Sequence, residues 1–353
     1  MDRKNQTRQK LKKLQSLWKK CTSLLIVMQD NPDPDAIAAA TALKELANKK
    51  TDISCKLAYG GTIGRAENRE LVHYLGFNFH PFSEISPESF DLIALIDSQP
   101  ATGNNPLAKD FVPDIVIDHH PFRNLSRDIT FTDIRQHYGA TSTILWEYLK
   151  AAGITPDIPT ATALLYGIRS DTQDLGREST RADIDAMEAL YPIANKRMLS
   201  QIQQGRVPTA YYQMLTTALA NTKMYEHCLI CNIGKIDNPD MVGEMADILL
   251  RHEQIDWVMC FGRTEKRLLL SLRTQDKNLP AGKVVRRVVR KIGTGGGHAS
   301  MAGGQIPLTR PRGPKPKRTH LERLIRDSFL KALKIKTKKG ERLVHIPVKD
   351  LKK

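Results

Sequence analysis

Short apolar runs alternate with helix-forming segments along the first half of the chain. The apolar runs have the length and composition of strands buried on both faces. They comprise residues 23–28, 53–59, 91–97 and 115–118. The segments between and after them are rich in residues with high helix propensity. They comprise residues 36–43, 70–75, 139–152 and 160–168. This alternation predicts an α/β fold built on a doubly wound parallel sheet.

The second half of the chain predicts a smaller α/β domain with a mixed sheet. A polar, helical stretch at about residues 182–222 precedes it. The expected elements then follow in the order strand, helix, strand pair, helix, glycine loop and short strand. They correspond to residues 227–236, 241–250, 257–263 with 267–273, 282–292 and the glycine-rich stretch from residue 293.

Both ends of the chain are strongly basic. The net charge is +16, and residues 1–20 carry eight basic and one acidic residue, while residues 310–353 carry sixteen basic and four acidic residues. Each end also contains the apolar spacing of an amphipathic helix, with Leu11, Leu14, Leu17 and Trp18 in one and Leu321, Leu324, Ile325 and Phe329 in the other. Such ends favour attachment to a polyanion, with nucleic acid ahead of a membrane surface. The alternative is that they are solvated, solubilising tails.

The apolar runs and the cysteines indicate the cellular compartment in which the protein is expected. The early apolar run at residues 23–28 is too short for a signal peptide or a membrane span. The five cysteines show no paired zinc-type spacing, which indicates a reduced, cytoplasmic setting. Cys228 and Cys231 form one C-x-x-C inside a strand-like run without a second pair, so we do not expect them to bind metal.

Acidic and histidine side chains follow several of the predicted apolar elements. They are Asp33 and Asp35, Asp97, Asp118 with His119 and His120, and Asp171. Each has an ordinary structural alternative: Asp33 and Asp35 as a turn and a helix N-cap, Asp97 as a loop cap, His119 as a buried hydrogen-bonded histidine. Together, however, carboxylates and imidazoles at one sheet edge are ligands for Mn²⁺ or, less well, Mg²⁺. Two such ions sharing a bridging carboxylate suit in-line attack on a phosphoester.

These residues give the chain a resemblance to the DHH phosphoesterase superfamily, which includes RecJ-like exonucleases, NrnA-type oligoribonuclease and pAp phosphatases, and family II pyrophosphatases. The matching motifs are Asn31-Pro32-Asp33-Pro34-Asp35-Ala36, Asp97, Asp118-His119-His120-Pro121 and Ser170-Asp171-Thr172. The stretch from Gly295 to Gly304 resembles the glycine-histidine signature of the DHH-associated C-terminal domain. The resemblance covers roughly residues 23–308 and implies a DHH catalytic domain (21–190) and a substrate-binding C-terminal domain (223–309). Pattern and charge predict the remaining parts, which are a basic N-terminal helix (1–20), a helical connector (191–222) and a basic linker and tail (310–353).

The resemblance also implies a role for each site residue. Asp97 bridges two Mn²⁺ ions, Asp33 binds the first, and Asp35, His119 and Asp171 bind the second. His120 faces the scissile phosphate as electrophile or proton donor. In the C-terminal domain, the substrate is held by the backbone of Gly295, Gly296 and Gly297, by His298 and, in the place of a substrate-binding arginine, by Arg273.

One position departs from the family pattern. The family usually has a histidine ligand of the first metal three residues before Pro32, and this chain has Gln29. An amide oxygen is a weaker ligand for Mn²⁺ than imidazole. We expect activity with looser occupancy of the first site, and the alternative is a nucleic-acid-binding protein with a degenerate site.

The Asp-Ala ending of the first motif resembles the NrnA-like branch. We therefore expect a Mn²⁺-dependent phosphoesterase acting on short oligonucleotides or on a nucleotide 3′-phosphate such as pAp. The alternative enzyme is a polyphosphate or pyrophosphate hydrolase. Few aromatic side chains lie near the motifs, so the sequence does not indicate how a base would be recognised.

Overall fold

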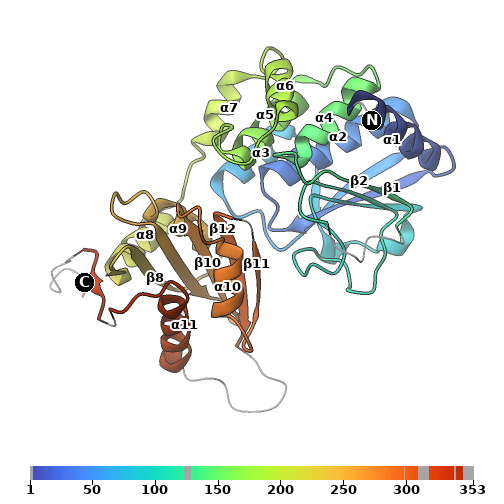
Figure 1. Ribbon diagram of the computed structural model, residues 1–353. Helices are drawn as coiled ribbons and strands as arrows, with labels where there is room; N and C mark the ends of the chain where they lie inside the picture. The colour runs from blue at the N-terminus through green and yellow to red at the C-terminus, as the bar shows by residue number, and fades with distance from the viewer. Residues whose placement is uncertain (1–2, 123–128, 298, 309–317, 338, 345–353) are drawn as a thin grey trace. The chain divides into compact units, whose positions relative to one another are not determined.

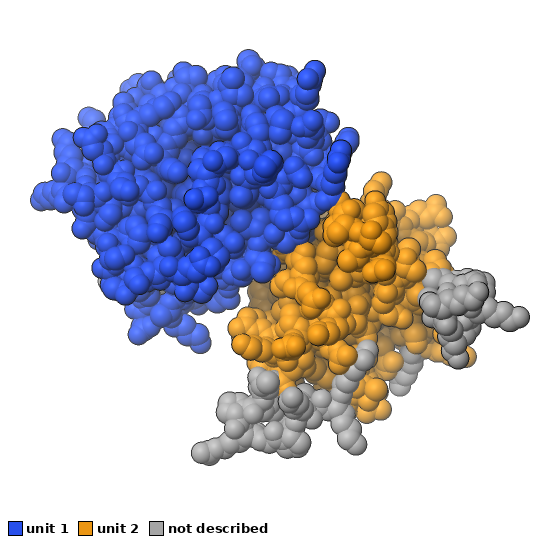
Figure 2. Space-filling model, turned by 180° about the vertical axis from the view of Figure 1, so that it is seen from behind, with its two compact units in different colours: residues 1–206 blue, residues 207–353 orange. Residues whose placement is uncertain are grey.

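The computed structural model describes residues 3–122, 129–297, 299–308, 318–337 and 339–344 (Figure 1). The chain forms two compact units, residues 1–206 and residues 207–353, which Figure 2 distinguishes by colour. Among the described residues, no helix has the length and apolar character needed to cross a membrane.

Unit 1 contains one sheet of six parallel strands in the order β3-β2-β1-β4-β5-β6. The strands are β1 (Ser23–Asp30), β2 (Ser54–Gly60), β3 (Phe79–Pro81), β4 (Leu92–Ile96), β5 (Ile115–Asp118) and β6 (Phe131–Ile134). The helices are α1 (Arg3–Trp18), α2 (Pro34–Lys50), α3 (Ala66–Leu75), α4 (Thr141–Ala151), α5 (Ile158–Thr172), α6 (Arg181–Leu190) and α7 (Lys196–Gln203). The predicted α/β fold with a parallel sheet is confirmed. The strand order reverses between β1 and β4, and such a switch point opens a crevice at the carboxyl ends of the strands.

The two faces of this sheet are covered differently. One face carries the main core, in which alternate residues of β1 such as Leu24 and Ile26 pack against helices α1 to α7. The other face buries Leu25 and Val27 under the short 3₁₀ segments η1 (Phe82–Glu84) and η2 (Pro87–Ser89) and the loops around them. Among the described residues, the α-helices of unit 1 that join a hydrophobic core therefore lie on one face of the sheet.

The basic N-terminal helix is part of this core. In α1, Leu11, Leu14 and Trp18 are at most 5 % exposed, as their helical spacing predicts. Arg3 forms ion pairs with Glu147 of α4, at 2.9 Å, and with Asp185 of α6, at 2.6 Å. The helix therefore packs on unit 1 through its apolar side. Nucleic-acid binding by either basic end stays a prediction.

Unit 2 contains a seven-stranded mixed sheet in the order β11-β12-β10-β9-β8-β7-β13, in which only the β8–β9 pair is parallel. The strands are β7 (Lys223–Tyr225), β8 (Cys228–Lys235), β9 (Trp257–Arg263), β10 (Arg267–Thr274), β11 (Thr294–Gly297), β12 (Met301–Pro307) and β13 (Glu341–Arg342). Helices α10 (Ala281–Val288) and α11 (Arg318–Ala332) cover one face, and α8 (Thr209–Asn221) and α9 (Met241–Leu249) cover the other. The predicted second α/β domain with a mixed sheet is confirmed. The predicted connector is shared between the units, since α7 packs in unit 1 and α8 in unit 2.

The glycine-rich stretch differs from the expected loop. Gly295, Gly296 and Gly297 form an edge strand that pairs with β12, because the backbone of a glycine run can approach its neighbours closely. A Cβ on Gly297 would lie 2.3 Å from the carbonyl oxygen of Met301, so this position tolerates only glycine. Cys228 and Cys231 lie on β8 in separate cores on opposite faces of the sheet, so they cannot bind one ion.

Candidate metal centre

The first motif joins the end of β1 to the start of α2. Asp33 is the N-cap of α2 and accepts a 3.0 Å hydrogen bond from the backbone N–H of Ala36, so the capping role foreseen as an alternative is real. Asp35, in the first turn, serves a different helix. Its two oxygens accept from the backbone N–H groups of Thr141, at 2.7 Å, and Ser142, at 2.8 Å, at the N-terminus of α4. The N-terminus of α2 thus fixes the carboxylate of Asp33, and the N-terminus of α4 fixes that of Asp35.

Asp97 directly follows β4 with a positive φ of 56°. A non-glycine residue in this region is uncommon, and the surrounding contacts must hold it there. The hydroxyl of Thr141 donates a 2.9 Å hydrogen bond to one of its carboxylate oxygens. Asp97 is 1 % exposed, so its carboxylate faces the other side chains of the centre rather than solvent.

The Asp-His-His triplet ends β5. Asp118 accepts hydrogen bonds from the backbone N–H groups of both histidines and, at 2.7 Å, contacts Nδ1 of His120. Gln99 donates to its other oxygen at 2.6 Å. Burial alone would favour the neutral acid, but these contacts, led by the hydrogen bond from His120, lower the pKa of Asp118 to about 2. The anionic Asp118 therefore orients the His120 ring.

His119 lies between a carbonyl and a carboxylate. Its Nδ1 is 3.0 Å from the carbonyl oxygen of Tyr138, and its Nε2 is 3.0 Å from Oδ2 of Asp171 near the end of α5. Because a carbonyl can only accept, Nδ1 must carry a proton. This arrangement fixes the tautomer in which Nε2 can bind a metal ion, as is usual for metal-binding histidines.

Most of the predicted ligands of unit 1 converge. Ligand atoms of Asp35, His119 and Asp171 lie within 4.8 Å of one another, and so do those of Asp97, His119 and His120. Gln29 joins the remaining carboxylate to this group, because its Nε2 is 3.1 Å from Asp33 and 3.3 Å from Asp97. The residues assigned to the second ion thus form one cluster, and Gln29 lies among those assigned to the first.

The buried carboxylates repel one another. Burial, followed by the negative charge of Asp171, raises the pKa of Asp33 and raises that of Asp35 to about 7. Burial and the charges of Asp35 and Asp33 raise the pKa of Asp97 well above its ordinary value. Carboxylates held together in this way are stabilised by divalent cations. Their oxygens and the imidazole nitrogens fit Mn²⁺ or Mg²⁺.

The structure adds one charged residue, Arg177, that the sequence analysis missed. After α5, Gln173, Asp174 and Leu175 all have positive φ angles, between 49° and 67°. The backbone N–H of Arg177 then donates to the carbonyl of Thr172, which returns the chain to the end of the helix. Burial opposes ionisation of Asp171, but its hydrogen bond to His119 and the charges of His119 and Arg177 lower its pKa.

The guanidinium of Arg177 thus acts on a predicted ligand. Its Nη1 is buried and has no hydrogen-bond partner among the described residues. The sequence signal was weak, since Arg177 lies six residues after Asp171 and only the intervening Gly176 marks a turn.

The predicted substrate-binding residues belong to unit 2. Arg273 pairs with Met301 across β10 and β12. Its guanidinium already donates to Asp247 and, at 2.7 Å, to the hydroxyl of Ser271. His298 lies outside the described residues.

Comparisons with known proteins agree with these two units. Residues 23–168 match the DHH family, N-terminal domain, and residues 225–325 match the DHHA1 domain. An uncharacterized protein of Methanocaldococcus jannaschii is 34% identical over 286 residues, which are 81% of this chain and 58% of that protein. A probable manganese-dependent inorganic pyrophosphatase of Lactobacillus gasseri is 30% identical over 172 residues, which are 48% of this chain and 54% of that protein. The chain thus spans little more than half the length of these two relatives.

Two solved structures share the fold. An exopolyphosphatase-related protein of Bacteroides fragilis aligns with a TM-score of 0.68 at 15% identity, covering 92% of this chain and 96% of that one. RecJ of Thermus thermophilus in complex with Mn²⁺ aligns with a TM-score of 0.51 at 13% identity, covering 93% of this chain and 55% of that one. The chain belongs to the DHH family, with a DHH N-terminal domain in unit 1 and a DHHA1 domain in unit 2.

Proposed function

We propose that this protein is a metal-dependent phosphoesterase whose centre lies in unit 1. The observation that carries the proposal is the convergence of two carboxylate–imidazole groups within 4.8 Å, with His119 common to both. Divalent ions bound there would supply Lewis acidity and a hydroxide nucleophile at neutral pH.

The side chains divide into two ligand sets. Asp35, His119 and Asp171 would hold one ion and Asp33 the other, with Asp97 available to both. The amide oxygen of Gln29 would complete the first set. As the amide is oriented in the structure, its nitrogen faces Asp33 and Asp97, and its oxygen accepts from Asn104 at 3.4 Å. Binding of the first ion therefore requires the amide to turn over, which supports weaker occupancy of this site.

His120 and Arg177 act on the substrate rather than on the ions. The carboxylate of Asp118, 2.7 Å from Nδ1, orients the His120 ring, and an imidazole in this place can act as the proton donor to the leaving oxygen. The unpartnered Nη1 of Arg177 can donate to a phosphoryl oxygen, whose negative charge grows in the transition state. Both groups would thus stabilise the negative charge that develops on the phosphate oxygens in the transition state.

For the substrate we propose short oligonucleotides or a nucleotide 3′-phosphate such as pAp. In this proposal Arg273 and the backbone of β11, with its three glycines, bind the part of the substrate away from the reacting phosphate. Arg273 must then exchange its contact with Asp247 for the substrate.

The second candidate is hydrolysis of pyrophosphate or polyphosphate. It is favoured by the similarity to manganese-dependent pyrophosphatases over 48% of the chain. A third reading, a nucleic-acid-binding protein without catalysis, is favoured by the Gln29 nitrogen between the two first-site carboxylates.

One experiment distinguishes these three candidate functions. The purified full chain with Mn²⁺ is given RNA of two to four nucleotides, pAp, pyrophosphate and tripolyphosphate in parallel, and released phosphate and mononucleotide are measured. Preferential turnover of short RNA or pAp supports the first proposal, and turnover of pyrophosphate or tripolyphosphate alone supports the second.

Asp97→Ala is the active-site variant, and Asp276→Ala in unit 2 is the matched control. If no substrate is turned over while RNA is bound, catalysis is absent and the third reading stands. Turnover that survives Asp97→Ala contradicts the two-ion arrangement, because the bridging carboxylate would then be dispensable.

A further inference from the structure

Unit 2 contains two adjoining cavities between its sheet and α11. They have volumes of about 320 Å³ and about 720 Å³, and Asn232, Phe261 and Glu322 line both. The joined space is of the size of a small-molecule site. Its lining residues on the sheet come from β7, β8, β9 and the start of β10, and Leu308 follows the end of β12, whereas no residue of the glycine strand β11 lines it. It is therefore separate from the predicted substrate-binding glycines.

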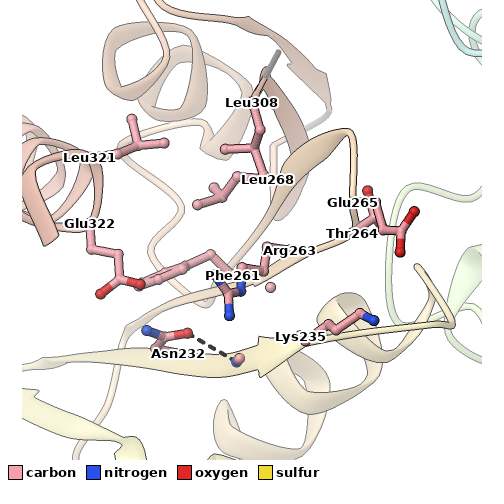
Figure 3. Close-up of a pocket in the computed structure, with 12 residues that line it drawn as sticks. Asn232, Lys235, Phe261, Arg263, Thr264, Glu265, Leu268, Leu308, Leu321 and Glu322 are labelled. Atoms are coloured by element: carbon pink, nitrogen blue, oxygen red, sulfur yellow. Dashed lines mark hydrogen bonds between the residues drawn. The ribbon is translucent and has the colours of Figure 1, made fainter. Parts of the chain in front are cut away.

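The smaller cavity is mostly apolar. Figure 3 shows Leu268, Leu308 and Leu321 on one side of the space and β8 on the other, with Phe261 and Arg263 between them. Two cationic side chains, Lys235 and Arg263, and two anionic ones, Glu265 and Glu322, also line it, so its charge is balanced. Such a compartment suits a flat, neutral, partly apolar group.

The larger cavity is cationic. Lys223 of β7 and Arg323 and Arg326 of α11 line it, against the single carboxylate of Glu322. Arg326 is held by Asp327 at 2.7 Å, and an Nη atom of Arg323 is 3.4 Å from His320. Side chains held in this way lose less entropy when they bind an anion, and guanidinium groups match the oxygens of phosphate.

A buried donor points to a ligand in the same space. Nε of Arg263 is buried and has no hydrogen-bond partner among the described residues. A buried polar group without a partner is costly, and a bound ion, water or ligand is one way to satisfy it. Arg263 belongs to the apolar cavity, where it could donate to an acceptor on a ring system.

We propose that the joined cavity binds a nucleoside phosphate, with its base in the apolar part beside Phe261 and its phosphate among Lys223, Arg323 and Arg326. An apolar compartment next to a cationic one matches the two halves of this ligand. The ligand is either a free nucleotide or one unit of a single-stranded nucleic acid, which share this chemistry. The site lies within unit 2 and does not depend on catalysis in unit 1.

The test measures binding by the full chain in the presence of EDTA, which prevents hydrolysis. AMP, adenosine, ribose 5-phosphate and inorganic phosphate are titrated by calorimetry, and a labelled eight-nucleotide RNA by fluorescence anisotropy. We expect AMP or the RNA to bind, and adenosine, ribose 5-phosphate and phosphate to bind at least about tenfold more weakly, because each lacks one half of the ligand. Binding of the RNA without AMP assigns the site to a strand, and binding of AMP assigns it to a free nucleotide.

The variants locate the ligand. Arg323→Ala with Arg326→Ala should weaken binding at least about tenfold, since charged hydrogen bonds to phosphate are lost. Arg263→Gln should weaken the binding of AMP more than the binding of inorganic phosphate. The control pair is Arg286→Ala with Arg287→Ala on α10, which removes the same charge from exposed positions. Asp97→Ala should bind like the unmodified protein even where it has lost hydrolysis.

Three results would overturn the proposal. They are equal losses in the two arginine pairs, measurable binding of AMP that is no tighter than that of inorganic phosphate, and absence of binding by both AMP and RNA. Because Asp97→Ala separates binding in unit 2 from hydrolysis in unit 1, failure of one proposal does not decide the other.

Discussion

Replacing Asp35 by asparagine should stabilise the metal-free protein at pH 8 and destabilise it at pH 4. The pKa of Asp35 is about 7 in the folded protein and 3.8 for the free side chain, so its ionisation in the folded state costs about 4 kcal/mol at pH 8. Because the folded state holds this proton more tightly than the unfolded state, its stability is highest below pH 3.8 and falls as pH rises from 3.8 to about 7. At pH 4 the same group costs less than about 1 kcal/mol.

The substitution also has a cost that does not depend on pH. Asp35 accepts from two backbone N–H groups of α4, and the asparagine side chain has only one oxygen to replace them. Leaving one buried N–H without an acceptor costs about 1–3 kcal/mol. The net effect is a gain of roughly 1–3 kcal/mol at pH 8 and a loss of similar size at pH 4.

The assay is urea unfolding of Asp35→Asn in EDTA, followed by tryptophan fluorescence. Trp257→Phe in every protein removes the tryptophan of unit 2, so that Trp18 and Trp146 report on unit 1. Asp183→Asn is the control. It is also buried and accepts from backbone N–H groups at a helix start, but it lies outside both ligand groups, so we expect a loss of stability at both pH values.

Addition of Mn²⁺ completes the test. At a concentration one hundred times its dissociation constant, a bound ion stabilises the folded protein by about 2.7 kcal/mol, and Asp35→Asn should lose most of this gain. If Asp35→Asn is less stable than the unmodified protein at pH 8 in EDTA, the centre is not a site of carboxylate repulsion and the reasoning fails.

Three further predictions follow from individual contacts. Gln29→His should raise the Mn²⁺ affinity of the first site by about 10–100-fold, as measured by calorimetry, because imidazole is the better ligand. Equal affinities of Gln29→His and Gln29→Ala would contradict the placement of the first ion beside Gln29. Arg177→Gln should lower kcat/KM about 100-fold at saturating Mn²⁺, because a charged hydrogen bond to the transition state is lost. Arg181→Gln on the exposed side of α6 should have little effect. Trp18→Ala should lower the free energy of unfolding by about 3–5 kcal/mol because the side chain is 1 % exposed, and a loss no larger than that of exposed Lys12→Ala would show that α1 is not part of the core.

The local pattern of apolar and polar residues was sufficient to predict much of the fold of this protein. Buried strands and amphipathic helices repeat with periods that are visible in the sequence, so the α/β class and α1 and α11 could be predicted. The candidate ligands of unit 1 could also be predicted, because polar residues at the ends of apolar strands gather at one edge of a parallel sheet. Sequence alone therefore pointed to Asp35, Asp97, His119 and Asp171.

Tertiary structure decided what depends on partners distant in the chain. Whether a glycine run forms a loop or an edge strand depends on a neighbouring strand, and β12 supplies it here. The carboxylate of Asp35 is fixed by α4, about one hundred residues away, and the ring of His119 by the carbonyl of Tyr138. Arg177 reaches the centre only through three consecutive left-handed residues, a conformation for which side-chain periodicity carries no signal. The sequence thus predicted which elements form and which groups are candidate metal ligands, while packing determined the orientation, charge and additional partners of these groups.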